Sequence, residues 1–492
     1  MPTDKHYLAI DLGAESGRVM LGTLSDGGRE GAGIKLTEIH RFPNIPVQLG
    51  NSLHWDILRL WHEIKTGINK AAASHDIAGI AVDTWGVDFG LLDSTGQLLG
   101  NPVCYRDPRT EKMPEALFSR LSQQKIYSIT GIQTMSLNTL FQLAALSFNN
   151  SPQLHAAKNI LFLPDLITYF LTGTMGTDYT IASTSQMLDA RTRQWSPDVL
   201  NAIGISASLF APISIPGEKN SIRGTVLPAV NEKLAAANTP VIAVGGHDTA
   251  SAVAAVPADS SKGDWLYLSS GTWSLLGAEI DEPVLTEKAA QYNITNEGGI
   301  GGGGGKIRLL KNLAGLWLLQ ECRREWAREA GGETEYDYAT LTQMAESAEP
   351  HIALLDVQDP AFSTPGNMPG KIIAHCTRTH QRVPQTHGEF ARVILESLAA
   401  SYAKVVQMLE EITGKRFKTL HIVGGGSQNN LLNQLAADAT NLPVLAGPVE
   451  ATALGNIITQ AITTGALPDI AAGRALVAKS LAARPFEPGA KR

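Results

Sequence analysis

The sequence has little cysteine and no long apolar run. Only 3 Cys occur among 492 residues, widely spaced at Cys104, Cys322 and Cys376. Such sparse thiols argue against a disulfide framework and are typical of a reducing compartment. No apolar run approaches the roughly 18 residues that cross a bilayer, and the opening MPTDKHY lacks an apolar signal core. We therefore expect a cytoplasmic protein that has no membrane partner.

Blocks of one charge are also missing. Lys and Arg total 40, Asp and Glu total 47, and the net charge is −7. Without a basic block, nucleic acid is not an expected partner. A hydrophobic content of 43% and a charged content of 18% indicate a globular chain. Its length favours two large domains over one core.

The opening stretch HYLAIDLGAESGRVMLGTL, residues 6–24, predicts a strand, a tight turn and a second strand. Gly13 and Gly17 lie in the turn, where glycine lets a ligand approach the backbone closely. Asp11 ends the first strand and Arg18 opens the second. An acid and a base thus flank a loop of N–H groups, which could hold a phosphate and its Mg²⁺. The simpler alternative is an ordinary hairpin.

Two later stretches have related patterns. DWLYLSSGTWSLLG, residues 264–277, again predicts a strand, a small polar turn and a strand, and it is a second candidate phosphate loop. KTLHIVGGGSQNN, residues 418–430, predicts a strand that ends in a glycine turn. The dinucleotide pattern G-x-G-x-x-G fails there because Asn429 stands where its last glycine should be. A dehydrogenase is therefore disfavoured.

A glycine run, GGIGGGGGK at residues 298–306, is the one low-complexity segment. The P-loop pattern fails here, since positions 300 and 307 are both Ile instead of Gly and Ser or Thr. We expect a flexible loop tip, with a phosphate contact by Lys306 as a minor alternative. Residues 307–330 are predicted to be mostly helical, because their apolar positions fit one helix face.

DTWGVDF, residues 83–89, is followed by a polar turn. Alternation places Asp83 and Trp85 on one face, and Gly86 removes a side chain beside them. The turn contains Arg106 and Asp107. These residues could form a polar wall for a hydroxylated ligand, or simply a solvated turn with a local ion pair.

A strand at Val241–Val244 leads through two glycines to His247 and Asp248, and a helix begins at Asp248 or Thr249. The carboxyl end of a strand is where open α/β sheets bind ligands. A carboxylate there could accept the proton of a substrate hydroxyl. The alternative is that Asp248 or Thr249 merely caps the helix.

Together these stretches resemble a known family. AIDLGAESGRVML, DTWGVDFGLLD, GGHDTASAV, YLSSGTWSLLG, LKNLAGLWLLQ, LHIVGGGSQNN and GPVEATALGN are similar to motifs of the FGGY carbohydrate kinases, within the actin/hexokinase/heat-shock-ATPase superfamily. The resemblance implies an α/β fold of two actin-like (ribonuclease H-like) domains with a nucleotide and sugar cleft between them. We place these domains at residues 1–240 and 241–457, followed by a helix and tail at 458–492 that could pack back on the first domain.

Within the family the chain is most similar to kinases of L-rhamnulose, which implies phosphate transfer from ATP to the sugar's 1-hydroxyl. The resemblance makes Asp248 the general base and Asp11 a holder of Mg²⁺, through water. The sugar contacts it implies are Gly86, His247, Asp248, Thr249 and Asn312. The ATP contacts it implies are Ala14, Glu15, Ser16, Gly17, Arg18, Thr272, Gln320 and Gly425.

Two alternatives to this assignment remain at the level of sequence. A kinase of the same fold could act on another ketose or a polyol, such as L-fuculose or D-xylulose. A non-kinase ATPase of the same superfamily would need no sugar base, and HDTASA would then be structural. The oligomeric state stays open.

Overall fold

The computed structural model describes residues 4–27, 31–218, 221–301, 305–332 and 336–489. The chain divides into two compact units, each discontinuous in sequence. The first comprises residues 1–260, 279–309 and 451–480, and the second comprises residues 261–278, 310–450 and 481–492. The domain boundaries at 240 and 457 stay a prediction. No helix in the described ranges is both long and apolar enough to cross a bilayer.

The first unit is built on a six-stranded sheet in the order β11-β12-β6-β1-β2-β3. Strands β6 and β12 run parallel to their neighbours β1 and β6, whereas β2 and β3 continue the sheet as antiparallel strands. The bounds of these strands are β1 (Lys5–Leu12), β2 (Ser16–Gly27), β3 (Gly31–Pro43), β6 (Ile77–Thr84), β11 (Ile222–Thr225) and β12 (Pro240–Ile242).

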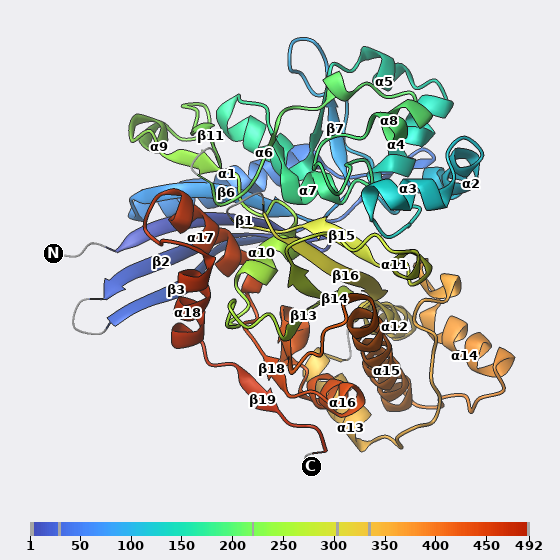
Figure 1. Ribbon diagram of the computed structural model, residues 1–492. Helices are drawn as coiled ribbons and strands as arrows, with labels where there is room; N and C mark the ends of the chain where they lie inside the picture. Colours follow the sequence, from blue (N-terminus) through green and yellow to red (C-terminus); the bar gives the residue numbers. More distant parts are fainter. Residues whose placement is uncertain (1–3, 28–30, 219–220, 302–304, 333–335, 490–492) are drawn as a thin grey trace. The chain divides into compact units, whose positions relative to one another are not determined.

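Helices cover both faces of this sheet. Helix α1 (Ile57–Ser74) begins where Asp56 accepts a hydrogen bond from the N–H of Arg59, and it buries an apolar stripe that includes Leu60 and Ile64. Helix α17 (Ala451–Thr463) packs on the opposite face, with α10 (Asp248–Ala254) and α18 (Ile470–Ser480) beside it. Figure 1 shows α17 and α18, in red, beside the blue strands β1 to β3, although more than 400 residues separate them in sequence.

Contacts between α17 and the sheet are close. Gln460 donates to the carbonyl of Leu8 at 2.9 Å, and Tyr7 shares a hydrogen bond with Thr464 at 2.6 Å. A Cβ on Gly455 would lie 1.7 Å from the carbonyl oxygen of Ser251, so α17 can approach α10 this closely only with glycine there.

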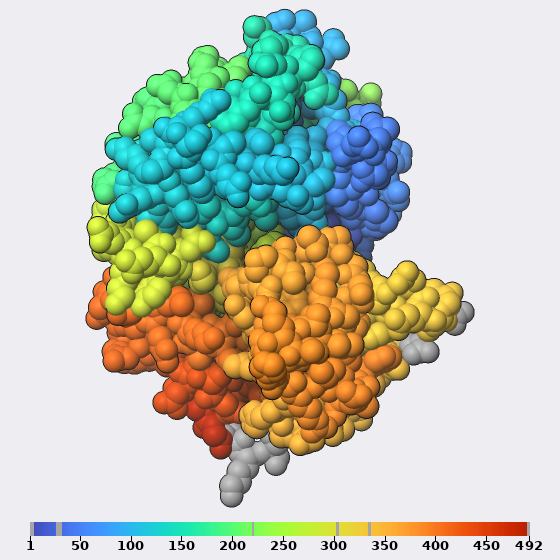
Figure 2. All heavy atoms as spheres, turned by 90° about the vertical axis from the view of Figure 1, so that its right-hand side faces the viewer, coloured from blue at the N-terminus to red at the C-terminus, as the bar shows by residue number. Residues whose placement is uncertain are grey.

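The elements β7, β8, α2 to α4, α7 and α8 form a mainly helical layer around a second core, which includes Phe141, Ile160 and Phe162, whereas α6 and α9 pack on the core of the sheet. Figure 2 shows the segment from α2 to α5, in blue-green, as one exposed face of this layer. The bounds of these and the other elements of the first unit are β4 (Val47–Leu49), β5 (Ser52–His54), β7 (Phe89–Leu92), α2 (Met113–Phe118), α3 (Gln123–Thr130), α4 (Thr139–Phe148), α5 (Pro152–Ala156), β8 (Asn159–Phe162), α6 (Leu163–Thr172), β9 (Thr177–Asp178), α7 (Tyr179–Ser183), α8 (Pro197–Ala202), β10 (Ile213–Ser214), α9 (Glu232–Ala236), α11 (Glu287–Gln291) and β15 (Thr295–Gly298).

The second sheet has the order β15-β16-β14-β13-β17-β18-β19. Its centre repeats the first sheet: β13 is antiparallel to β14 and parallel to β17, as β1 is to β2 and β6. The elements of the second unit are β13 (Trp265–Ser270), β14 (Trp273–Ile280), β16 (Ile307–Ala314), α12 (Trp317–Glu329), α13 (Tyr338–Ser347), α14 (Met368–Arg378), α15 (His387–Thr413), β17 (Thr419–Val423), α16 (Asn430–Thr440), β18 (Val444–Ala446) and β19 (Arg484–Phe486). The end of β14, from residue 279, and the start of β16, up to residue 309, belong to the first unit.

The prediction of a helix over residues 307–330 is wrong in its first part. Residues Ile307–Ala314 form strand β16, and the helix α12 begins only at Trp317. A Cβ on Gly315 would lie 2.5 Å from the carbonyl carbon of Trp273, so the chain passes directly over the preceding hairpin at this point. That close passage separates the strand from the helix.

Candidate active site

The first unit gathers three carboxylates where parallel strands end. Asp11 and Asp83 are register partners on the adjacent strands β1 and β6. The next residue after Asp83, Thr84, forms a bridge to His247, and its N–H donates to the carbonyl of Gly246 at 2.9 Å. Asp248 therefore begins α10 beside the ends of both strands. This is the position predicted from the sequence for His247 and Asp248.

Asp248 is the first residue of α10, and His247 occupies the N-cap position without a side-chain capping bond. One carboxylate oxygen of Asp248, Oδ1, accepts the N–H of Thr249 at 2.5 Å and the hydroxyl of Thr249 at 3.2 Å. His247 Nε2 lies 3.4 Å from the same oxygen. Among the described residues, no donor engages Oδ2 of Asp248, and its side chain is 32% exposed. The carboxylate is thus held by one oxygen and accessible at the other.

Burial raises the pKa of Asp248, and the Asp11 charge adds to the rise, whereas His247 opposes it. A carboxylate with a raised pKa is a stronger proton acceptor near neutral pH. Two hydrogen bonds fix the backbone that precedes Asp248. The N–H of Gly246 donates to the Asp178 carboxylate at 3.1 Å, and the N–H of His247 donates to the Thr180 hydroxyl at 3.2 Å.

Asp83 is a second candidate ligand for a cation, which the sequence analysis did not predict. Its side chain is fully buried, and Oδ2 accepts a hydrogen bond from Asn456 at 2.6 Å. Oδ1 has no hydrogen-bond partner among the described residues. Burial raises the pKa of Asp83 well above its usual range, and the neighbouring Asp11 carboxylate adds to that rise. An orphaned buried oxygen beside a second carboxylate fits a bound divalent cation, whose charge would offset this cost.

The residues predicted for ATP contact lie in the β1–β2 hairpin: Ala14 and Glu15 are in its turn, and Ser16, Gly17 and Arg18 begin strand β2. Arg18 donates to Asp11 Oδ2 at 2.5 Å across the hairpin. Asn44 holds the turn by donating its side chain to Gly13 O at 2.9 Å and its backbone N–H to Glu15 O at 3.0 Å. The requirement for glycine at Gly17 has a packing cause, since a Cβ there would lie 2.3 Å from the Phe42 ring.

Gly86 lies against His247. A Cβ on Gly86 would lie 3.4 Å from both His247 Nε2 and Thr184 Oγ1, which is tighter than most such contacts. The following residue, Val87, has φ of 69°, an unusual value for a β-branched side chain. Such strained backbone is concentrated at functional sites. The structure therefore brings Gly86, His247, Asp248 and Thr249 together, as the sequence predicted for the sugar side.

Asp88 is the centre of the polar wall that was proposed for residues 83–89. Asp88 accepts hydrogen bonds from the indole N–H groups of Trp55 at 2.6 Å and Trp85 at 3.0 Å, and from Gln142 at 2.9 Å. Burial nevertheless raises its pKa to about 6. Asp107, in the nearby polar turn, accepts the N–H of Leu53 at 2.7 Å. Asp107 also accepts the N–H of Arg109 at 3.0 Å, so its carboxylate links the polar turn to strand β5.

The second unit contains the other predicted contacts. The carbonyl of Thr272, in the β13–β14 turn, accepts from the N–H groups of Gly315 and Trp317, both at 3.2 Å. Gln320 lies on the first turns of α12, and its buried Oε1 has no hydrogen-bond partner among the described residues. This orphaned oxygen fits a ligand contact.

Gly425 follows β17, in the glycine turn. No atom lies within 4 Å of a Cβ built on Gly425, whereas a Cβ on Gly426 would lie 2.0 Å from Ser270 Oγ. Gly426 is thus required by packing, and Gly425 faces open space. Asn312 is nearly buried on β16, where its carbonyl accepts from Gln358 at 3.0 Å.

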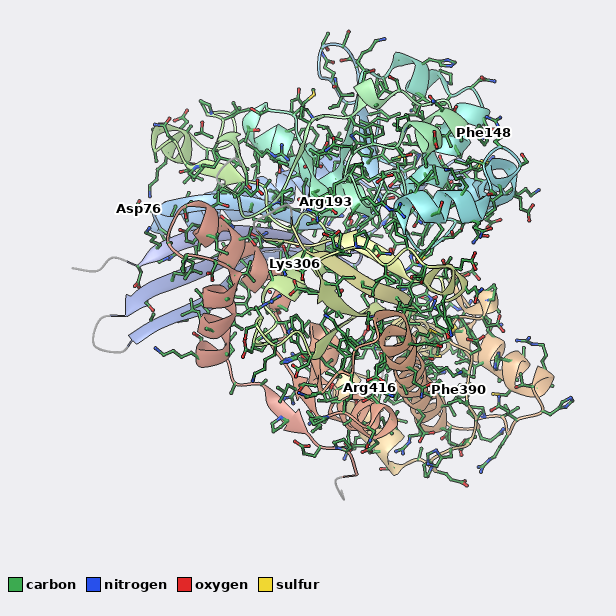
Figure 3. All side chains as sticks on the ribbon, viewed as in Figure 1. Asp76, Phe148, Arg193, Lys306, Phe390 and Arg416 are labelled. Atoms are coloured by element: carbon green, nitrogen blue, oxygen red, sulfur yellow. The ribbon has the colours of Figure 1, made fainter. Side chains whose placement is uncertain are left out.

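Other candidates have structural partners. Lys306, labelled in Figure 3, pairs with Asp281. The segment HCTRTH, residues 375–380, has metal-ligand side chains in its sequence, but His375 lies 3.3 Å from Asp359 and the adjacent Cys376 is buried. No cluster of three or more His, Cys, Asp or Glu side chains that could hold a metal occurs within the described ranges. The interpretation of the glycine run as a loop tip falls on residues 302–304, which lie outside the described residues.

Comparisons with known proteins agree with this architecture. The N-terminal domain model of the FGGY family of carbohydrate kinases matches residues 6–255, and the C-terminal domain model matches residues 266–464. The chain belongs to the FGGY family of carbohydrate kinases. The family resemblance stated from the sequence is thereby confirmed, and the dehydrogenase and non-kinase alternatives are not favoured.

Relatives of this FGGY kinase include the rhamnulokinase of Bacteroides thetaiotaomicron, 45% identical over 98% of this chain and 96% of that protein. The rhamnulokinase of an Enterobacter species is 42% identical over 99% of this chain and 95% of that protein. Among solved structures, a gluconate kinase from Lactobacillus acidophilus has a TM-score of 0.76 at 16% identity, covering 99% of this chain and 94% of its own.

A glycerol kinase from Plasmodium falciparum with ADP has a TM-score of 0.76 at 18% identity, with 99% of this chain and 94% of that chain covered. At such low identity these structural matches establish the fold, which is the two-domain, actin-like fold predicted from the sequence.

Proposed function

We propose that this carbohydrate kinase transfers the γ-phosphate of ATP to the 1-hydroxyl of L-rhamnulose, which gives L-rhamnulose 1-phosphate and ADP. The full-length similarity to curated rhamnulokinases, 45% identical over 98% of this chain in one case, supports this substrate. The placement of Asp248 carries the chemistry. Its Oδ2 is accessible while Oδ1 is held by Thr249, so a substrate hydroxyl can be met by a fixed acceptor.

In this reaction Asp248 accepts the proton of the 1-hydroxyl as the sugar oxygen bonds to the γ-phosphorus. The bond from that phosphorus to the bridging oxygen breaks, and ADP leaves. Phosphoryl transfer depends mainly on positioning and on charge neutralisation. We assign the positioning of the sugar to Gly86, His247 and Thr249, with Asn312 as a further contact.

The nucleotide contacts belong to two groups of residues. The β1–β2 hairpin, from Ala14 to Arg18, offers backbone N–H groups and one guanidinium to the phosphates. Thr272, Gln320 and Gly425 are assigned to the nucleotide in the second unit. The orphaned Oε1 of Gln320 and the open space at Gly425 support these assignments.

Asp11 and Asp83 are the residues that would hold Mg²⁺. Mg²⁺ keeps several waters and is usually held by one or two carboxylates and the substrate phosphates, so two protein carboxylates are enough. When bound, the ion supplies positive charge to the transferring phosphoryl group.

Release of ADP by the purified protein, with and without a ketose, tests the proposal. Mg-ATP would be supplied with L-rhamnulose, L-fuculose, D-xylulose or L-ribulose at matched concentrations. We expect ADP release to require a sugar and to be fastest with L-rhamnulose. A higher kcat/KM for another ketose would overturn the substrate but keep the sugar kinase. Equal ADP release without sugar would overturn the reaction.

A further inference from the structure

A buried arginine lies behind His247 and has no role in the reaction described above. Arg308, on β16, is 0% exposed. Its Nε donates to the carbonyl of Gly298 at 2.8 Å, and its Nη2 donates to His247 Nδ1 at 3.1 Å. Glu297, on β15, places Oε2 3.2 Å from Arg308 Nη2 and 3.2 Å from His247 Nδ1. These three side chains form a cluster, Arg308–Glu297–His247, that ends at Asp248.

The hydrogen bond from Arg308 determines the protonation of the imidazole. A guanidinium has only donors, so His247 Nδ1 must accept with its lone pair. In the neutral ring the proton is then on Nε2. Nε2 lies 3.4 Å from Asp248 Oδ1 and faces Gly86, where a Cβ would lie 3.4 Å away. The ring is thus positioned to donate towards the carboxylate.

Glu297 is an alternative hydrogen-bond partner for His247 Nδ1, and it would require the opposite tautomer. If Nδ1 carried a proton, His247 would donate to Glu297, and Arg308 could not donate to the same nitrogen. The hydrogen-bond geometry favours Arg308 as the partner of Nδ1. A fully buried guanidinium needs a nearby anion, and Glu297, itself 4% exposed, provides it.

We propose that Arg308, neutralised by Glu297, is a positioning residue that holds His247 in the Nε2–H tautomer and directs that N–H towards Asp248. His247 then keeps Oδ1 of Asp248 engaged, and Oδ2 stays available to the sugar hydroxyl. The catalytic consequence of this arrangement rests on the proposed function, whereas the tautomer itself does not.

The first experiment reads the tautomer directly in the full-length protein. Long-range ¹H–¹⁵N spectra of protein labelled at histidine distinguish a protonated from an unprotonated ring nitrogen, and the His247→Gln variant identifies the His247 signals. We expect Nε2 protonated and Nδ1 unprotonated. A proton on Nδ1, alone or together with Nε2, would overturn the proposal. This result does not depend on which sugar, if any, is phosphorylated.

The second experiment compares three variants with a matched control. Arg308→Met should lower kcat by about 10-fold or more with little change in KM for ATP, since proton transfer contributes about 10²- to 10⁴-fold. Arg308→Lys retains a buried cationic donor and should restore part of kcat. Glu297→Gln removes the anion beside Arg308 and should lower stability. Its effect on kcat should be milder than that of Arg308→Met, because Arg308 still donates to Nδ1, whereas a Nδ1–H form would make kcat more sensitive to Glu297.

Arg474→Met is the control, because Arg474 is also buried in the first unit, pairs with Glu279, and donates to the carbonyl of Val253 at the opposite end of α10 from Asp248. It should lose stability but keep kcat. A kcat within two-fold of the unchanged protein in folded Arg308→Met would overturn the positioning role. If Arg308→Met does not fold, Arg308→Lys and Glu297→Gln still decide between the two partners of Nδ1. Failure of the unchanged protein to phosphorylate any ketose would count against the proposed function alone.

Discussion

Asp11 and Asp83 face each other across two adjacent parallel strands, and the inner one, Asp83, keeps a buried oxygen without a hydrogen-bond partner among the described residues. Two neighbouring carboxylates repel each other when both are ionised, and burial strengthens that repulsion. Arg18 already pairs with Asp11, so the remaining cost is carried by Asp83, and a divalent cation or a proton would relieve it. This relationship leads to the first prediction.

Asp83→Asn should raise the Mg²⁺ concentration needed for half-maximal kinase activity by several-fold, because one of two carboxylates is lost. The melting temperature should not fall, since the variant removes a buried charge while keeping an acceptor for Asn456. Titration of activity with Mg²⁺ at saturating ATP measures the shift. Asp107→Asn, a buried carboxylate that holds the Leu53 backbone, serves as the control. An unchanged Mg²⁺ requirement in Asp83→Asn would remove Asp83 from the metal site.

Asp248→Asn should lower kcat by on the order of 10² or more, because the amide cannot accept the proton. The amide oxygen can still accept from Thr249, so the fold and the KM for sugar should change little. Steady-state ADP release measures both constants. The matched control is Asp56→Asn, which keeps a good N-cap for α1. Near-normal turnover of Asp248→Asn would rule out this base.

Gly425→Ala should leave the melting temperature unchanged and raise the KM for ATP. No protein atom lies within 4 Å of the added methyl group, so only a ligand near the backbone would meet it. Thermal melts and ATP titrations separate these effects. Gly17→Ala is the opposite case, because its methyl group would meet Phe42, and such overpacking costs about 1–3 kcal/mol. An unchanged KM for ATP in Gly425→Ala would place the nucleotide elsewhere.

Asp88 should make stability depend on pH. Its pKa is raised to about 6 in the folded protein, so between pH of about 4 and 6 the folded state binds more protons than the unfolded state. Stability from this group is then greatest at low pH and decreases as pH rises through about 6. The free energy of unfolding should change by about 3 kcal/mol over this range, because the pKa differs by about two units between the folded and unfolded states.

Denaturant unfolding of the unchanged protein and of Asp88→Asn, repeated at several pH values, isolates this contribution. The unchanged protein should lose stability relative to Asp88→Asn as pH rises over that window. A constant difference between the two, or one of opposite sign, would contradict a raised pKa.

Local patterns predicted the strand–turn–strand units and the strand end that carries Asp248, because glycine turns and alternation are short-range signals. The strand at residues 307–314 was missed, since Leu309, Leu310 and Leu313 fit a helix face as well as a buried strand. Arg308 and the buried Oδ1 of Asp83 could not be predicted. Their meaning depends on His247 and Asn456, which are distant in sequence and meet them only in the folded chain.

Helix α17 also has a consequence for biosynthesis. Its Gln460 side chain donates a hydrogen bond to the carbonyl of Leu8 on β1, and its Asn456 side chain donates one to Asp83 on β6. These early strands therefore acquire their partners only after residues near 460 have been translated. The ribosome must therefore add residues 261–278 and 310–450 of the second unit before the first unit can be completed. Until then the face of β1 and β2 that receives Ile457 stays open to chaperones. Translation arrested before residue 451 should leave a nascent chain that proteases cleave readily, although most of its sheet has already been synthesised.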